Sequence, residues 1–209
     1  MNRAIFAVWA LFPTLFLHIG PTLAAEKYCY SESGAVAVDV SQPVTRQFLD
    51  KAKEIGVSTI IRYYDYDPPT LPEKTLRRQE RDQIVANGFD LAVVFQHWNN
   101  KFSSFTAERG KGDAERALEL ARENDQPTDG VIYFGVDGSW EKDTELQNTI
   151  AYFKAANDFL KPNHYNVGVY GSGLVCSRLL DQKLAEYCWL ANAKSWPGYK
   201  DFFDSKNGI

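Results

Sequence analysis

The sequence is poor in the residues that build metal centres. Its 209 residues include three cysteines and three histidines. Cys29, Cys176 and Cys188 lack the short spacings of metal ligands, and His18 lies in an apolar amino-terminal stretch. We therefore expect no bound metal and no cofactor.

Clusters of basic residues are also absent. The formal net charge is −4 at pH 7, from 23 lysines and arginines against 27 aspartates and glutamates. Nucleic acids and anionic membrane surfaces are bound through concentrated positive charge. The sequence therefore argues against both partners and leaves neutral molecules such as sugars open.

Long apolar runs are confined to the amino terminus. Residues 4–19 are mostly apolar and follow Arg3, but Pro13 and His18 interrupt them, and a membrane-spanning helix needs about 20 such residues. The small residues that end at Ala25 complete a pattern typical of a secretory signal peptide. We predict that residues 1–25 are removed, with an uncleaved anchor as the alternative.

The predicted mature chain, residues 26–209, is long enough to bury one sizeable core. No Gly/Ser linker or change in composition divides it, so we expect a single-domain monomer that is secreted or periplasmic and has no membrane span. Export permits a disulfide. Cys176 on a predicted helix and Cys188 on the following strand are the expected pair, which leaves Cys29 over.

Short β-branched runs alternate strictly with amphipathic helical segments along this chain. The predicted strands are residues 35–40, 58–65, 90–97, 130–137, 165–172 and 186–193. In the segments between them apolar residues recur at helical spacing, as Phe48, Ala52 and Ile55 do. This alternation is typical of βαβ units around a parallel sheet.

A parallel sheet of this kind either closes as a barrel or stays open and doubly wound. The dinucleotide-binding form of the open sheet needs a glycine-rich turn after its first strand, and here that turn reads DVSQPV. We therefore predict an α/β fold of the (β/α) TIM-like barrel type. Six strands are two short of eight, and residues 195–209 can add at most one. The barrel is thus expected to be irregular or incomplete at its carboxyl-terminal end.

Polar and aromatic residues gather at the carboxyl ends of the predicted strands, where such folds bind their ligands. They are Asp39, Arg62, Tyr63, Gln96, Trp98, Asp137, Tyr170 and Trp189. Sugar sites combine carboxylates, which exchange protons at the glycosidic oxygen, with aromatic rings that stack on sugar faces. The sequence therefore predicts a carbohydrate ligand, with Asp39 and Asp137 facing each other across the barrel mouth.

Several of these residues also have a purely structural interpretation. Asp39 could cap the next helix, and Asp137 could order its own loop. Arg62 either keeps Asp39 ionised or pairs with another carboxylate within the sheet. Asp113 either caps the helix that it is expected to begin or reaches the site. Trp140 lies in a predicted loop, where it either stacks on a sugar or packs into the core.

Several motifs, in this order, resemble the family 25 lysozymes. AVDVSQPV is similar to their first strand, VIYFGVDGSW to the strand that carries their Asp-x-Glu, and GVYGS with CWLANAKSW to later strands. Within this superfamily the chain most resembles the glycoside-hydrolase-like domain of unknown function numbered 1906, through these strands and the motif GKGDA. The resemblance covers residues 36–199 and implies a lysozyme-like TIM barrel that acts on glycans.

One departure from the lysozyme pattern concerns the general acid. The glutamate of Asp-x-Glu, which the resemblance makes the acid, corresponds here to Ser139. A serine hydroxyl cannot donate a proton to a leaving group at neutral pH. Glu141, two residues further on, is the candidate replacement, and a solvated loop charge is the alternative for it. His97 is also at a strand end and is expected to be passive.

These features together predict an exported glycan-active protein that resembles a glycoside hydrolase and acts on peptidoglycan or another cell-envelope polysaccharide. Asp39, Asp137 and Glu141 are its expected catalytic residues. The other strand-end residues and Asp113 are expected to bind the substrate. The alternative is a non-catalytic carbohydrate-binding protein that has lost its general acid. No motif favours a third class, a scaffold for another secreted protein.

Overall fold

The computed structural model describes residues 36–67 and 70–207. The predicted signal peptide and Cys29 lie outside these residues. The described chain forms one sheet of six parallel strands that lie side by side in chain order. The strands are β1 (Ala37–Asp39), β2 (Thr59–Tyr64), β3 (Asp90–Phe95), β4 (Val131–Gly135), β5 (Asn166–Gly171) and β6 (Tyr187–Leu190). Each lies within a strand predicted from the sequence.

Helices connect the strands and follow the last one. They are α2 (Arg46–Glu54), α3 (Arg78–Ala86), α4 (Ala107–Glu123), α5 (Asp143–Leu160), α6 (Gly173–Asp181) and α7 (Tyr199–Asn207), with short 3₁₀ helices η1 (Phe102–Ser104) and η2 (Lys161–Asn163). The terminal segment that could have added a strand forms helix α7 instead. In the described ranges no helix has the length and apolar character to cross a membrane.

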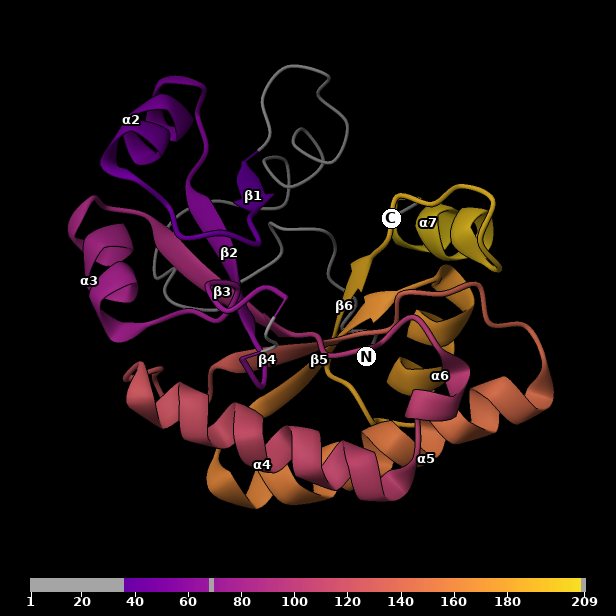
Figure 1. Cartoon of the computed structure of the whole chain (residues 1–209). Coiled ribbons are helices and arrows are strands. Elements are labelled where there is room, and N and C mark those ends of the chain that lie inside the picture. Colours follow the sequence, from indigo (N-terminus) through magenta and orange to yellow (C-terminus); the bar gives the residue numbers. More distant parts are fainter. Residues whose placement is uncertain (1–35, 68–69, 208–209) are drawn as a thin grey trace.

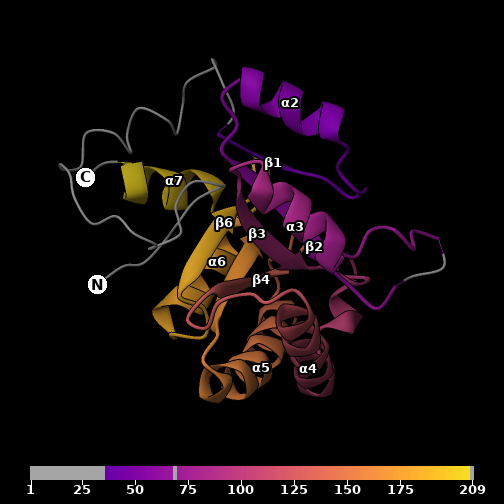
Figure 2. The same ribbon diagram turned by 90° about the vertical axis from the view of Figure 1, so that its left-hand side faces the viewer.

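The sheet curves into a half-barrel. Among the described strands, β1 and β6 each pair on one side only, so the barrel does not close. Helices α2 and α3 flank the first strands, and α4, α5 and α6 lie along the outside of the others (Figure 1). Helices α4 and α5 run side by side, as a second view confirms (Figure 2). The predicted incomplete TIM-like barrel is therefore confirmed.

Side chains alternate between the two faces of this sheet, because successive residues of a strand point to opposite sides. On β2, Ile60 and Tyr64 belong to the large buried cluster that the helices share, whereas Ile61 and Tyr63 belong to a second cluster. The described residues of the second cluster come from strands alone. We call this side the concave face. Alternate residues along a strand thus face either the helices or the inside of the half-barrel.

The close approach of α4 and α5 depends on a glycine. An added Cβ at Gly110 would stand 2.2 Å from the carbonyl oxygen of Tyr152, a backbone atom that cannot move aside easily. Helix α4 begins earlier than the sequence suggested, since Thr106 is its N-cap and accepts a hydrogen bond from the backbone N–H of Arg109. Asp113, expected to begin the helix, therefore lies inside it.

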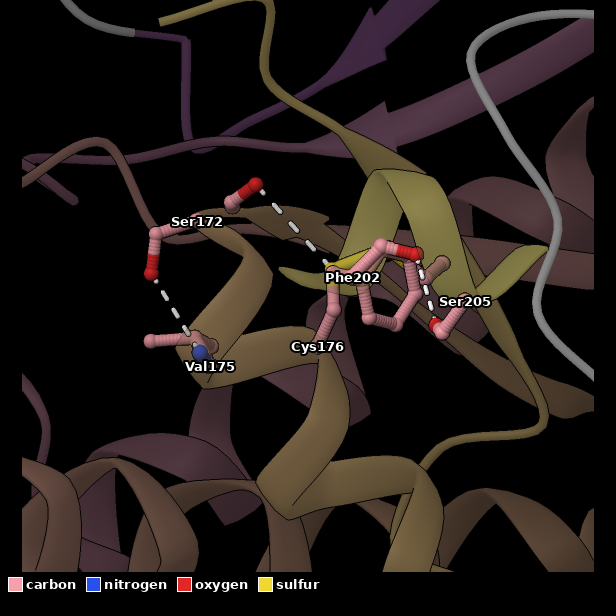
Figure 3. The surroundings of a disulfide bond; sticks show 7 residues. Ser172, Val175, Cys176, Phe202 and Ser205 are labelled. Carbon is pink, nitrogen blue, oxygen red and sulfur yellow. Dashed lines mark hydrogen bonds between the residues drawn. A yellow bond between two sulfur atoms is a disulfide. The ribbon is translucent and has the colours of Figure 1, made fainter. Parts of the chain in front are cut away.

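A disulfide joins Cys176 on α6 to Cys188 on β6, which is the pair expected from the sequence. Both cysteines are fully buried, and Phe202 of α7 belongs to the same buried cluster (Figure 3). The bond ties the last strand of the half-barrel to the helix that covers it, at the edge where no further strand continues the sheet in the described chain.

We expect loss of this disulfide to destabilise the protein without changing the fold. The two cysteines are 12 residues apart, and closing a loop of that length stabilises a folded chain by about 3 kcal/mol. The double variant Cys176→Ser, Cys188→Ser should lose about that much free energy of unfolding in a urea titration. Reductant should destabilise the wild type and leave the variant unchanged, and an equal effect on both would contradict this assignment.

Candidate functional site

Four side chains gather on the concave face at the carboxyl end of the sheet. We call Asp39, Tyr63, Asp137 and Tyr170 the carboxylate–tyrosine cluster. The hydroxyl of Tyr63 donates a hydrogen bond to Asp39 Oδ2 at 2.7 Å. Both aspartates are exposed to solvent, whereas both tyrosines are half-buried.

The electrostatics of the two tyrosines show that both carboxylates are near both phenols. Burial is the largest cause that raises the pKa of Tyr63 and of Tyr170, and the negative charges of Asp39 and Asp137 raise both pKa values further. The tyrosines therefore remain neutral hydrogen-bond donors. Neither aspartate is sequestered in an ion pair with a described residue, and Asp39 does not cap α2, because Thr45 does.

Two further predicted residues line the same face. The ring of Trp189 on β6 packs edge-on against Tyr170, with centroids 4.8 Å apart, and against Tyr133 at 6.4 Å. Gln96 follows β3, and its side chain lies against Gly135, where an added Cβ would stand 3.5 Å from Gln96 Cγ. The concave face thus presents carboxylates, phenols, an amide and an indole. Their roles in catalysis or substrate binding stay predictions.

The segment expected to supply a general acid runs from this face toward α5. Ser139 and Glu141 are both exposed. The backbone N–H of Glu141 donates to Glu145 Oε2 at 3.2 Å, which anchors the segment to the first turn of α5. Trp140 is buried against Gly138, where an added Cβ would lie 2.4 Å from the indole ring. Of the two interpretations of Trp140, packing into the core is therefore the one that the structure supports.

Arg62 does not reach this site, which corrects its assignment to substrate binding. Its side chain is fully buried on the helix side of β2 and binds Glu80 of α3 through two hydrogen bonds, Nε–Oε1 at 2.6 Å and Nη2–Oε2 at 3.0 Å. It also donates to the carbonyl oxygens of Val40 and Glu73. Because the buried guanidinium is neutralised and held by these groups, its role is structural.

Asp113 is also a structural residue, and its prediction as a substrate-binding group was wrong. It is 2% exposed, between α4 and α5, and accepts a hydrogen bond from the Tyr152 hydroxyl at 2.6 Å. Arg109 Nε lies 3.4 Å from its Oδ2. Burial raises the pKa of Asp113, while Tyr152 and Arg109 oppose the rise.

Sequence reasoning missed a polar group at the ends of β2 and β3. Asp65, 1% exposed, accepts a salt bridge from Lys74 Nζ at 3.1 Å and contacts His97 Nδ1 at 2.6 Å. Since the buried carboxylate is an acceptor, Nδ1 carries the hydrogen of this bond. An aspartate and a histidine that end neighbouring strands were the available signal. The lysine lies in the intervening loop and could not have been found from spacing.

Trp98 and Asn99 follow β3 in an unusual conformation. Trp98 is 59% exposed and has a φ of 52°, a left-handed conformation that costs a bulky residue roughly 1–3 kcal/mol. Asn99, 4% exposed, accepts from the His97 backbone N–H at 2.7 Å and donates to the Gly135 carbonyl at 2.6 Å. Its own carbonyl accepts from the backbone N–H of Asp137 at 2.9 Å. This turn is therefore fixed to β4.

No metal centre is formed by the described residues, since none of them form a group of three or more suitable histidine, cysteine or carboxylate ligands.

The buried ion pair of Arg62 and Glu80 gives a test of the structural role of Arg62. Glu80→Gln leaves the guanidinium buried without a counter-charge, so it should lower the free energy of unfolding by about 3–5 kcal/mol in urea. Asp50→Asn is the matched control, because it breaks the exposed pair of Arg46 and Asp50 and should cost about 0.5 kcal/mol or less. Equal losses in the two variants would contradict the structural role.

The raised pKa of Asp113 predicts the sign of a pH effect. The folded protein holds this proton more tightly than the unfolded chain, so ionisation of Asp113 lowers stability as pH rises above the ordinary value of 3.8. Asp113→Asn has no such ionisation. Its stability relative to the wild type should therefore improve from about pH 3 to about pH 7. Urea unfolding at both values measures this, and a relative stability that falls with pH would contradict it.

Comparison with known proteins gives one relative of similar sequence. The uncharacterized protein YbfG of Bacillus subtilis (strain 168) is 27% identical over 168 residues, which are 76% of this chain and 23% of YbfG. The chain thus spans less than a quarter of that relative.

Solved structures share the fold. The Mycobacterium tuberculosis Tat-secreted protein Rv2525c, in complex with HEPES, has a TM-score of 0.65 at 20% identity over 77% of this chain and 80% of its own. An uncharacterized B. stearothermophilus protein has a TM-score of 0.60 at 19% identity over 74% of this chain and 73% of its own. Residues 50–206 match the family model of the Rv2525c-like, glycoside hydrolase-like domain. The chain therefore belongs to the Rv2525c-like, glycoside hydrolase-like domain family.

Proposed function

We propose that this protein is exported and acts on a glycan, either peptidoglycan or another cell-envelope polysaccharide, at the carboxylate–tyrosine cluster. The main support for this proposal is that Asp39, Asp137, Tyr63 and Tyr170 lie close together on the concave face. They lie at the carboxyl-terminal edge of the sheet, which we call the rim. The family to which the chain belongs supports this choice of chemistry.

The chemistry of the cluster fits an uncharged sugar. Carboxylates accept hydrogen bonds from sugar hydroxyls, and the neutral phenols offer hydroxyls as donors and acceptors. The indole of Trp189 and the ring of Tyr170 supply aromatic surface for the apolar face of a sugar ring. In the hydrolytic form of the proposal, Glu141 donates a proton to the leaving oxygen as the glycosidic bond breaks. A water molecule supplies the new bond to the anomeric carbon, and the carboxylates of Asp39 and Asp137 stabilise the positive charge on that carbon and take up the proton of the water. The Asp39–Tyr63 bond holds the first carboxylate in place.

A non-catalytic carbohydrate-binding protein is the second candidate. Ser139 stands at the position of the acid, and Glu141 belongs to a segment anchored to α5 through its own backbone N–H. A binding site needs only the carboxylates and aromatic rings of the concave face, all of which are present. The two candidates therefore share a site and differ in whether a proton is delivered.

Export is the second part of the proposal. Residues 1–25 have the pattern of a signal peptide, and the fold relative Rv2525c is a Tat-secreted protein. We propose that residues 26–209 fold as one domain after removal of residues 1–25 and that this domain acts as a monomer.

We expect the mature protein to release reducing ends from purified peptidoglycan or from a panel of soluble glycans. Asp137→Asn and Glu141→Gln should each lower the rate at least about 100-fold, as loss of an acid–base group does. Asp129→Asn changes an exposed carboxylate that precedes β4, at the opposite end of this strand from Asp137, so it is the control and should retain the rate.

The outcomes separate the two candidates. Loss of activity in both variants supports the hydrolase with Glu141 as its acid. Retention of glycan in a pull-down without any reducing ends supports the binding protein. If the wild type neither binds nor cleaves any glycan of the panel, the proposed function is wrong.

A further inference from the structure

Three rings outside the carboxylate–tyrosine cluster form a continuous aromatic patch. The Tyr66 and His97 rings lie edge-on with centroids 5.0 Å apart, and the His97 and Trp98 rings follow at 5.8 Å. Tyr66 is 42% exposed and Trp98 is 59% exposed. We call Tyr66, His97 and Trp98 the ring patch. Large exposed aromatic side chains that adjoin one another indicate a binding surface more often than scattered ones do.

The central ring of this patch is oriented by buried charge. Asp65, itself paired with Lys74, holds His97 Nδ1, so the ring cannot turn freely. His97 Nε2 has no hydrogen-bond partner among the described residues. With Nδ1 bonded to Asp65, Nε2 is the polar ring atom that the patch presents to a ligand. A hydroxyl of a bound ligand is the chemical partner that such a nitrogen takes.

The conformation of Trp98 gives an independent indication of function. Six described residues other than glycine have positive φ, and Trp98 is the one with a large apolar side chain. Such a conformation persists only where the surroundings impose it, and it is found preferentially at binding and catalytic sites. Here Asn99 imposes it through its three bonds to His97, Gly135 and Asp137. The fold therefore keeps an exposed indole in a strained turn.

Two bridges join the ring patch to the carboxylate–tyrosine cluster. Lys74 Nζ lies 4.8 Å from the ring centroid of Tyr63 in the cluster and also binds Asp65 behind the patch. Asn99 connects the turn of Trp98 to the backbone of Asp137. Both sets of residues follow the same ends of neighbouring strands. The two surfaces are thus adjacent parts of one rim, held in fixed relation.

We propose that the ring patch is a second sugar subsite, which binds a more distant ring of the same glycan chain. The indole of Trp98 stacks on the sugar, and His97 Nε2 forms a hydrogen bond with one of its hydroxyls. This inference rests on the proposed function, because the glycan must also occupy the cluster. Its consequence is that affinity increases with the length of the glycan.

The test uses chito-oligosaccharides, from the dimer to the hexamer, as soluble probes of glycan length. Calorimetric titration of the mature protein should give a higher affinity for the hexamer than for the dimer. Trp98→Gly should lower the hexamer affinity about tenfold, and so reduce the ratio of hexamer to dimer affinity, because it removes the stacking surface. Glycine tolerates positive φ, so this variant should keep or raise the melting temperature.

Two controls accompany that variant. Trp98→Phe retains a ring and should keep most of the length dependence. Phe102→Ala removes another exposed aromatic, 45% accessible, from the same loop and should leave both affinities as they are in the wild type. A fall in melting temperature for Trp98→Gly with unchanged hexamer affinity would show that Trp98 is structural and overturn the subsite.

Failure of the subsite and failure of the proposed function give different results. If the wild type binds the probes and Asp137→Asn weakens binding while Trp98→Gly does not, the subsite alone is wrong. If the wild type binds neither the probes nor peptidoglycan, both the proposed function and the proposed subsite are wrong. Loss of hexamer affinity in Trp98→Gly but not in Phe102→Ala supports both.

Discussion

Each strand lies between two environments, the helices on one side of the sheet and the concave face on the other. Successive side chains point to opposite faces, so each strand must supply apolar residues to the helices and a different set to the concave face. On β2 this rule separates Arg62, which binds Glu80 of α3, from Tyr63, which binds Asp39. Two neighbouring residues thus have different roles, since Arg62 supports the structure and Tyr63 belongs to the candidate site.

The support beneath the rim is largely polar and buried. Arg62 of β2 makes four hydrogen bonds, two to Glu80 of α3, one to the carbonyl of Val40 after β1 and one to the carbonyl of Glu73 in the loop before α3. Asp65 and Asn99 act in the same way at the next strands, where they hold His97 and Asp137. Buried polar groups of this kind are costly unless they are fully bonded, and once bonded they favour a single arrangement. The exposed groups of the rim are therefore carried by a rigid layer.

The open shape of the half-barrel sets how a ligand reaches that rim. No described strand closes the sheet between β6 and β1, and helix α7 follows the last strand. The disulfide between Cys176 and Cys188 stabilises the edge that this leaves. The ends of β1 to β5 remain next to one another, so groups far apart in the sequence lie at the same end of the sheet.

The alternation of strands and helices, the parallel sheet and the likeness to the glycoside hydrolases were all predictable from the sequence, because hydrophobic periodicity and the order of motifs can be read without the fold. The cysteine pair was predictable because it joins a predicted helix to the strand that follows it. The sequence also placed Asp39, Asp137, Tyr170 and Trp189 at strand ends. The three-dimensional structure was needed to establish which strand-end residues lie on the concave face. Arg62 faces the helices, where it binds Glu80, and Asp113 is buried between α4 and α5 beside Tyr152 and Arg109. Lys74 and Asn99 bond to groups near the site from positions that no spacing rule predicts. Buried partners are a property of packing between elements, and for this reason local patterns could not reveal them.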